Sequence, residues 1–343
     1  MNTFGGYLVI RDDMNSRQMK IFANFLIKDV TAYSMDQDAI YNRNLEIFLL
    51  WASRETEIID ELLQGAKTSD VIAERTDVTK RAASIVLDAL ADYGYVTVDG
   101  DEYKATEELD GFDPEAGVFE KGILPHRLDS LENYMELPQT MRTGDPPEPD
   151  EEKFRNFVGA MATIDDMTVR AGVTAAEHVH PRPERVLDVG GGPGRFSEEF
   201  SRRGADVTLL DREDVIDLVR PYLEDKNVKL CVGDARESLP NGFDLIFSAR
   251  MTVSMTPEEL YDYFNNVLGA LDSGGTFVCM DHVRGRAEVA ERFSVHMLTM
   301  APSGRTKTAE QYRSCLDETG FVNSEVREIP GTDFQAIIGE NPQ

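Results

Sequence analysis

The chain has 343 residues, 41% of them hydrophobic, which is enough for two domains that each bury a core. Its 63 acidic residues outnumber the 35 basic ones and give a formal net charge of −28, which repels nucleic acid phosphates and anionic membranes. We therefore expect no nucleic-acid partner and no membrane partner. The charge is typical of a halophilic acidic surface, and a surface for a basic partner is the alternative interpretation.

The cysteines and the first twenty residues indicate in which cellular compartment the protein works. Cys231, Cys279 and Cys315 are far apart and form no Cys-x-x-Cys pair, which disfavours a structural zinc site or a disulfide framework. The first twenty residues lack the apolar stretch of a signal peptide, and no run approaches the roughly 18 apolar residues of a membrane helix. We expect a cytoplasmic protein without a metal site.

Residues 1–108 predict a mainly helical domain. Apolar residues such as Leu45 and Phe48 recur with helical spacing up to Gly65. A short helix, a turn and a second helix that stops at Gly94 follow, and then two short strands around an Asp-Gly hairpin signal. This order is typical of a winged helix.

The second helix of this pattern argues against DNA binding. Lys80 and Arg81 stand at its start, but Asp88 and Asp92 follow, and a protein that reads DNA needs a cluster of cations. Its apolar residues instead favour a buried or dimer-forming face.

Residues 109–152 predict a connector that ends in GDPPEPDEE, where prolines and acids indicate a solvated loop and a domain boundary. From residue 153 to 343, strand-like and helical runs alternate, which predicts a parallel sheet covered on both faces. The strand-like runs are 185–189, 206–211, 228–234, 244–249 and 276–283, and two final runs, 324–329 and 334–340, predict an antiparallel edge.

Two helices in this part carry clear boundary signals. Thr256 is a predicted N-cap with Pro257 in the first turn, and Gly274 is the predicted stop. Thr308 and a glutamine three residues later have capping-box spacing, and that helix should end at Gly320.

The turn after the first of these strands is rich in glycine and reads Gly190-Gly191-Gly192-Pro193-Gly194-Arg195. Open α/β sheets bind ligands at the carboxyl ends of their strands, and glycine lets the backbone approach a ligand closely. Arg195 stands where a dinucleotide fingerprint needs its last glycine. The pattern Gly-x-Gly-x-Gly preceded by Asp188 fits instead the loop of S-adenosylmethionine-dependent methyltransferases.

Two more acids close the neighbouring strand-like runs. Asp211 ends the second run, where a carboxylate can accept hydrogen bonds from both ribose hydroxyls. Asp234 ends the third, where it is placed to receive an adenine amino group. Together with the glycine turn, these acids predict a cofactor site at one edge of the sheet.

Nearly the whole chain resembles the small-molecule O-methyltransferases of bacteria, fungi and plants, the group that includes caffeic-acid, hydroxyindole and polyketide O-methyltransferases. Residues 68–106 are similar to the family's winged helix, 154–161 to the helix that opens its catalytic domain, and 187–194 to its cofactor loop. Residues 297–321 are similar to its substrate wall and late helix. The resemblance implies a seven-stranded class I (Rossmann-like) methyltransferase domain over 153–343.

The resemblance also implies partners and roles. It implies a homodimer formed through the N-terminal domain, S-adenosyl-L-methionine as cofactor, and a small aromatic or quinone-like methyl acceptor. It assigns to the cofactor Asp188, Gly190, Gly192, Asp211 for the ribose, and Asp234 with Ala235 for the adenine. We also expect Gly191, Arg212, Gly233 and Ser248 to contact the cofactor.

The catalytic stretch departs from the family. The family usually reads Arg-x-x-His-Asp-Trp after the fourth strand, and that histidine deprotonates the acceptor hydroxyl. Here Arg250 matches, but Val253 takes the histidine position. Of the two acids that support the histidine in plant members, one matches Asp281 and the other is replaced by Thr306.

Three hypotheses follow from the missing base. The protein methylates oxygen by positioning or with another base, it methylates an electron-rich ring carbon, or it binds the cofactor for a non-methylating or regulatory role. The candidate catalytic residues are Asp281, His282, His296 and Arg250. Strand alternation should turn only one of Asp281 and His282 toward the pocket. Arg250 is expected to orient the cofactor or an anionic group, because guanidinium does not give up its proton.

Overall fold

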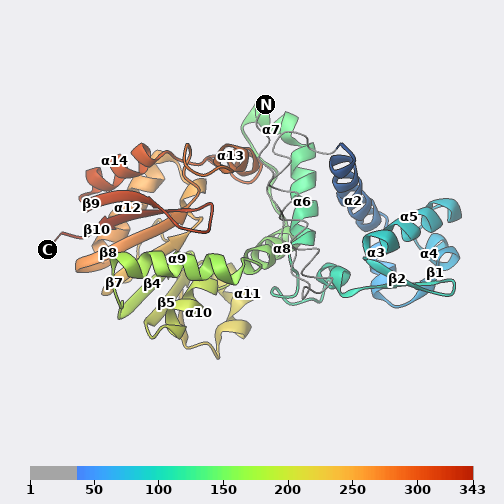
Figure 1. Cartoon of the computed structure of the whole chain (residues 1–343), viewed down its shortest axis with the longest axis horizontal. Coiled ribbons are helices and arrows are strands. Elements are labelled where there is room, and N and C mark those ends of the chain that lie inside the picture. The colour runs from blue at the N-terminus through green and yellow to red at the C-terminus, as the bar shows by residue number, and fades with distance from the viewer. Residues whose placement is uncertain (1–36, 343) are drawn as a thin grey trace, which may run out of the picture.

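The computed structural model of the chain describes residues 37–342, with side chains from residue 42 onward (Figure 1). Residues 1–36 of the predicted N-terminal domain lie outside the described residues. One end of the molecule is a helical unit with a small three-stranded sheet of order β1-β3-β2. Its elements are α2 (Gln37–Glu55), α3 (Ile58–Leu63), β1 (Lys67–Thr68), α4 (Ser69–Arg75), α5 (Lys80–Tyr93), β2 (Val96–Asp99) and β3 (Glu102–Ala105).

This unit has the predicted order of helix, turn, helix and hairpin. Thr68 and Thr79 cap the two helices, since their hydroxyls accept hydrogen bonds from the backbone of the first turn. Gly94 ends α5 in the left-handed conformation, with φ of 89°. The prediction of one continuous helical stripe up to Gly65 is wrong, because the helix is interrupted at Glu57, whose φ is 59°.

The connector is more structured than the sequence indicated. It contains η1 (Glu107–Phe112), α6 (Leu124–Met135) and α7 (Leu137–Thr143), and only the proline-rich stretch before α8 (Glu151–Ala162) is a loop. Helix α6 packs against α8 and contacts α2. Arg54 of α2 forms ion pairs with Asp129 and Glu132 of α6, which tie the helical unit to the connector.

The other end of the molecule is a seven-stranded sheet of order β6-β5-β4-β7-β8-β10-β9. Its strands are β4 (Arg185–Val189), β5 (Asp206–Asp211), β6 (Val228–Val232), β7 (Phe243–Ala249), β8 (Leu271–Asp281), β9 (Val322–Glu328) and β10 (Gln335–Glu340). Strand β10 pairs antiparallel with both β8 and β9, as the last two strand-like runs predicted.

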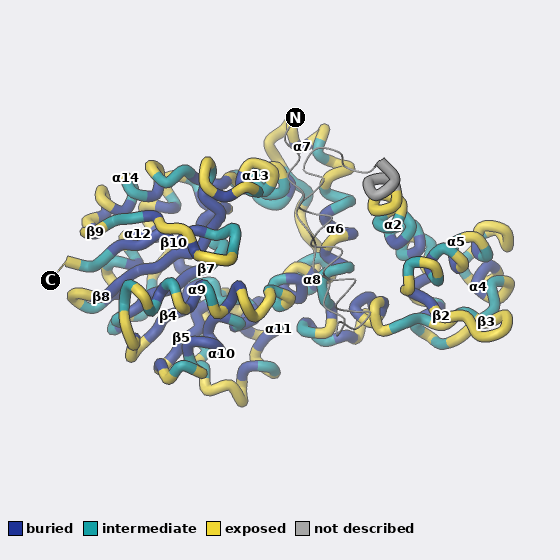
Figure 2. The backbone as a smooth tube through the Cα atoms, in the orientation of Figure 1, coloured by how far each residue is buried: buried dark blue, intermediate teal, exposed yellow. Residues whose placement is uncertain are grey.

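Helices cover both faces of this sheet, which is the predicted α/β class. The helices are α9 (Asp166–Val179), α10 (Arg195–Arg202), α11 (Glu213–Leu223), η2 (Thr252–Ser254), α12 (Pro257–Ala270), α13 (Ala290–Leu298) and α14 (Ala309–Thr319). Apolar side chains of α9 and α10 form one core with the sheet, and those of α12 and α14 form another. Figure 2 shows the central strands as the buried interior between exposed helix surfaces.

The capping predictions are confirmed at two helices. Thr256 and Thr308 each accept a hydrogen bond from the third residue of the helix and form complete capping boxes. Gly320 ends α14 with φ of 103°. Gly274 does not end α12, because that helix stops at Ala270 and β8 begins at the next residue.

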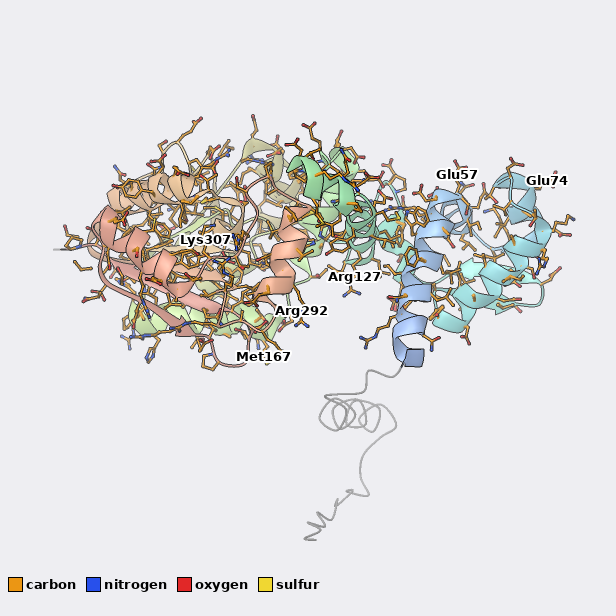
Figure 3. All side chains as sticks on the ribbon, turned by 90° about the horizontal axis from the view of Figure 1, so that it is seen from above. Glu57, Glu74, Arg127, Met167, Arg292 and Lys307 are labelled. Atoms are coloured by element: carbon orange, nitrogen blue, oxygen red, sulfur yellow. The ribbon has the colours of Figure 1, made fainter. Side chains whose placement is uncertain are left out.

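Charged side chains lie on the surface of the helical unit, as Figure 3 shows for Glu57 and Glu74. Lys307, by contrast, lies within the sheet unit, 8% exposed, and its ammonium donates to the backbone carbonyl of Thr252 over 2.6 Å. Among the helices of residues 37–342, none has both the length and the apolar character needed to cross a membrane.

Candidate functional site

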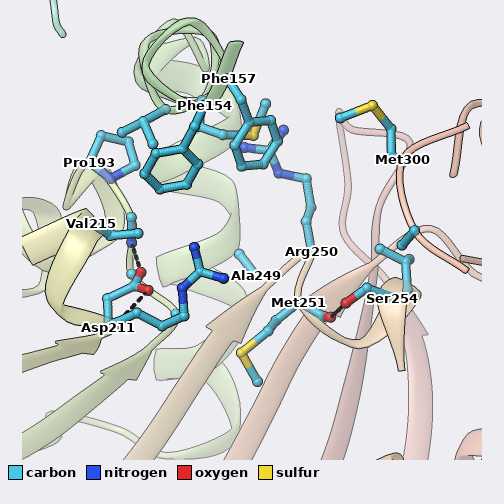
Figure 4. Close-up of a pocket in the computed structure, with 18 of the residues that line it drawn as sticks. Phe154, Phe157, Pro193, Asp211, Val215, Ala249, Arg250, Met251, Ser254 and Met300 are labelled. Atoms are coloured by element: carbon cyan, nitrogen blue, oxygen red, sulfur yellow. Dashed lines mark hydrogen bonds between the residues drawn. The ribbon is translucent and has the colours of Figure 1, made fainter. Parts of the chain in front are cut away.

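A cavity of about 580 Å³ lies between the carboxyl edge of the sheet and the helices α6, α8 and α13. Its volume is in the range of small-molecule sites in proteins. Figure 4 shows a close-up, with Pro193, Asp211 and Val215 on one side and Met300 on the other. The glycine turn, buried Asp188 and half-buried Asp211 line the first part, and mostly apolar side chains line the second. We call these the cofactor half and the acceptor half.

The glycine turn forms the floor of the cofactor half. Gly190 and Gly192 have φ of 66° and 52°, a left-handed region that favours glycine. A Cβ on Gly191 would lie 2.6 Å from the side chain of Leu209, so the turn packs tightly against β5. A Cβ on Gly192 would meet nothing within 4 Å. The turn is therefore closed toward the sheet and open toward the cavity.

Two carboxylates stand beside this floor. Asp188 is 1% exposed and accepts a hydrogen bond from the Ser197 hydroxyl over 2.6 Å. Burial raises the pKa of Asp188 to about 7, and the nearby charge of Asp211 adds to the rise. Asp211 accepts hydrogen bonds from the backbone N–H groups of Gly192 and Arg212, over 2.9 and 2.8 Å, and burial raises its pKa as well.

The loop after β6 brings further predicted cofactor residues to the cavity. Gly233, Asp234 and Ala235 all line it after β6. The Arg236 guanidinium binds the Asp234 carboxylate over 2.6 Å and lowers its pKa. Ser248, by contrast, is fully buried in β7 and is not among the lining residues, so the structure gives no support to its assignment to the cofactor.

Two arginines lie over the cavity. The Arg212 guanidinium is 5.5 Å from the ring centre of Phe154. Arg250 has φ of 57°, a strained backbone conformation for a residue with a side chain. Its side chain extends toward Phe154 and Phe157 in Figure 4, and burial lowers its pKa. Among the described residues, no hydrogen bond or ion pair engages its guanidinium. This cation is therefore available to an anionic ligand.

The acceptor half has an apolar wall. Val253, at the position of the family's usual histidine, lies in η2, is 2% exposed and lines the cavity. A valine side chain cannot accept a proton. Other apolar lining residues on this side include Phe157, Met161, Met251, Phe293, Met297 and Met300.

The candidate catalytic residues fall on different sides of the cavity wall. Arg250 and His296 line the cavity, but Asp281 and His282 do not. Asp281 is fully buried and accepts a hydrogen bond from the Thr252 hydroxyl over 2.7 Å. His282 stacks on Phe334, with ring centroids 4.1 Å apart. Both residues therefore serve the packing behind the site, and the expectation that one of them faces the pocket is wrong.

Several lining residues were not singled out in the sequence. His126, Asp129 and Asn133 reach the cavity from α6, and Lys153 and Phe157 reach it from α8. Helical spacing over 124–135, with Pro125 near the start, is a signal for α6 itself. No local pattern says which face of that helix meets a sheet edge that follows β4, much later in the chain.

The sequence and the fold were compared with known proteins. A family model described as an O-methyltransferase domain matches residues 146–322, which is more than half of the chain. The 3-amino-4-hydroxybenzoate 4-O-methyltransferase of Streptomyces cremeus is 26% identical over 154 residues, which cover 42% of this chain and 42% of that protein. The 3-hydroxy-5-methyl-1-naphthoate 3-O-methyltransferase of Streptomyces sahachiroi is 24% identical over 313 residues, which cover 82% of this chain and 86% of that protein.

A solved structure shares the fold over most of the chain. Human N-acetylserotonin methyltransferase in complex with SAM superposes with a TM-score of 0.65 at 17% identity. The match covers 91% of this chain and 99% of the human one.

The raised pKa of Asp188 predicts a pH dependence of stability. Because its pKa is about 7 in the folded protein against 3.8 for an ordinary Asp, the folded state holds an extra proton between these values. The free energy of unfolding should therefore fall as the pH rises through this range. Asp188→Asn should flatten this dependence in denaturant unfolding curves. Asp217→Asn, at an exposed acid of α11, is the control, and equal slopes in Asp188→Asn and wild type would contradict the prediction.

Proposed function

The chain belongs to the O-methyltransferase domain family, and from this premise we propose that it transfers the methyl group of S-adenosyl-L-methionine to a hydroxyl group of a small aromatic molecule. The observation that carries the proposal is one cavity that joins the glycine turn and its two carboxylates to an apolar, aromatic wall. Such a cavity can hold a polar cofactor and a flat acceptor side by side.

The residues of the cofactor half fit S-adenosylmethionine. The space above Gly192 is open, and ionised Asp211 offers only acceptor oxygens, which suit ribose hydroxyl donors. We assign the ribose to Asp211, the adenine to Gly233, Asp234 and Ala235, and the rest of the cofactor to the turn beside Asp188. When bound, the cofactor supplies an electrophilic methyl group on a sulfonium. The protein's part is to hold the acceptor oxygen in line with that methyl group.

The acceptor class is inferred from the wall and the free cation. Phe157 and Phe293 offer ring surfaces for a flat molecule. Arg250 offers a guanidinium that can bind a carboxylate through two parallel hydrogen bonds. Both curated relatives are named for hydroxylated aromatic acids. We therefore propose a hydroxylated aromatic carboxylate as the acceptor class.

The base must come from a residue other than Val253. His296 of α13 lines the acceptor half and carries the imidazole that the sequence offered as a candidate. Burial lowers its pKa, which keeps it in the neutral, proton-accepting form. We assign His296 a catalytic role on this ground.

We also propose that each chain has three parts, which are the N-terminal domain at 1–108, the connector at 109–152 and the methyltransferase domain at 153–343. We propose further that two chains form a homodimer. The exposed apolar residues Leu45 and Phe48 on α2, 42% and 46% accessible, support a dimer formed through the N-terminal unit.

The acceptor proposal is tested by methyl transfer in concentrated salt. We expect methylated product from S-adenosylmethionine with 3-amino-4-hydroxybenzoate or 3-hydroxy-5-methyl-1-naphthoate, detected by mass spectrometry. Nuclear magnetic resonance of the product should place the methyl group on oxygen. A methyl group on a ring carbon would support the alternative of a carbon methyltransferase. Tight cofactor binding without transfer to any phenol would support the non-methylating alternative.

The cofactor assignment is tested by calorimetric titration with S-adenosylhomocysteine, the demethylated cofactor. Asp211→Ala should weaken binding by roughly 10- to 100-fold, because hydrogen bonds to a charged group contribute about 1.5–3 kcal/mol. Asp217→Ala removes the same charge from an exposed position of α11 and should bind as wild type does. Equal affinities in the two variants would refute the ribose assignment.

The dimer is tested by light scattering of the full chain. Wild type should have twice the mass of one chain, and the double substitution Leu45→Asp with Phe48→Asp should have the mass of one, because charges would enter the apolar contact. Met167→Asp, at an exposed residue of α9 that Figure 3 labels, should leave the dimer intact. A monomeric wild type would rule the dimer out.

A further inference from the structure

Two histidines from distant segments meet at the acceptor half of the cavity. His126 is in the first turn of α6, and His296 is in the last turn of α13. Their ring centroids are 6.3 Å apart, and their ring planes are nearly perpendicular at 88°. Both residues line the cavity, and His126 is 7% exposed. The position of His126 beside His296 was not visible in the sequence.

The other titratable groups around this pair are engaged or cannot accept a proton. Asp129 accepts hydrogen bonds from Arg54 over 2.8 Å and from the Asn156 amide over 3.0 Å. The Lys153 ammonium pairs with Glu132 over 2.7 Å. In the direction of the sheet, Glu259 accepts from the backbone of Thr256, and Arg250 is a cation without a lone pair. The His126 ring and Nε2 of His296, by contrast, form no hydrogen bond within residues 37–342 and are open to a proton.

Contacts on α6 and α8 fix both rings. The Tyr134 hydroxyl is 2.9 Å from Nδ1 of His296, which leaves Nε2 of that ring for another partner. The ring of Phe157 packs edge-on against His126, with centroids 5.6 Å apart. Within the described part of the chain, no residue forms a hydrogen bond with the His126 ring. Its nitrogens are therefore available to a ligand in the cavity.

The electrostatics allow this pair to hold one proton. Burial lowers the pKa of His126, the neighbouring His296 lowers it further, and Asp129 opposes the shift. Burial also lowers the pKa of His296. Both rings are therefore neutral at neutral pH, and a proton on one disfavours a proton on the other.

We propose that His126 and His296 together form the proton acceptor for the acceptor hydroxyl, with Tyr134 as a residue that positions the pair. This inference rests on the proposed function. As the acceptor oxygen bonds to the methyl carbon, its O–H bond breaks and the proton passes to an imidazole nitrogen. The electrons of the carbon–sulfur bond stay on sulfur, which becomes a neutral thioether.

The proposal explains how the reaction proceeds without a histidine at position 253. A phenol has a pKa near 10, so only about one molecule in a thousand is ionised at neutral pH. A positioned base typically contributes 10²- to 10⁴-fold to the rate. The pair takes over this role from α6 and α13, which meet at these two rings, instead of from η2.

The first test is independent of turnover. Histidine pKa values are measured by nuclear magnetic resonance on the full chain with S-adenosylhomocysteine bound. His296→Gln should raise the pKa of His126, because it removes the neighbouring positive charge. His178→Gln, at an exposed histidine of α9, is the matched control and should leave it unchanged. If the pKa of His126 is the same in His296→Gln and wild type, the rings are not coupled and the proposal is overturned.

The second test uses turnover with 3-hydroxy-5-methyl-1-naphthoate. His126→Gln and His296→Gln should each lower kcat by about 100-fold, and the double variant should lose little more, because the two rings act as a unit. Tyr134→Phe should shift the pH profile of kcat and leave KM nearly unchanged. Full kcat in both single variants would overturn the proposal. Absence of transfer by wild type would instead count against the acceptor class, while the coupling test still decides whether the pair exists.

Discussion

The parallel pairing of β4 with β5 is the constraint on which the rest of the site depends. This pairing sets Asp188 opposite Leu209 and Val189 opposite Leu210, so both strands end at the same edge. Asp188 and Asp211 thereby come close enough for one charge to raise the pKa of the other. The glycine turn leaves β4 at this edge and packs on Leu209, so the sheet sets the position of the cavity floor.

The sequence predicted well the features that are local in the chain. The glycine turn, the acids at the strand ends and the capping box at Thr256 are each contained in a few neighbouring residues, and the structure has the turn, the strand ends and the cap where they were expected. Asp281 and His282, the candidate catalytic residues at the end of β8, do not line the cavity, and the reason is physical. Alternation says that Asp281 and His282 point to opposite sides of a strand, but both sides are filled here, by Thr252 and by Phe334.

Features that depend on long-range packing could not be predicted. His126 and His296 are brought together by the docking of α6 on the sheet unit, which no periodicity in either helix encodes. The interruption of the helix at Glu57 was also missed, because the apolar spacing continues past Glu57 while the helical backbone conformation does not. The exposed side chains of Leu45 and Phe48 carried the same apolar signal as core residues. A hydrophobic pattern marks the apolar face of a helix, but it does not distinguish a face packed in the core from an exposed one.

The ion pair between Arg54 and Asp129 joins the small helical unit to the wall of the cavity. Asp129 also accepts a hydrogen bond from Asn156 of α8, so this ion pair ties the α6 and α8 side of the cavity to the helical unit. The side of the cavity near α6 is thus supported by the helical unit, whereas the glycine turn is supported by the sheet. A substitution of Arg54 would leave Asp129, which lines the cavity, without its cation partner, so a change in the helical unit reaches the cavity wall from a residue that does not line the cavity.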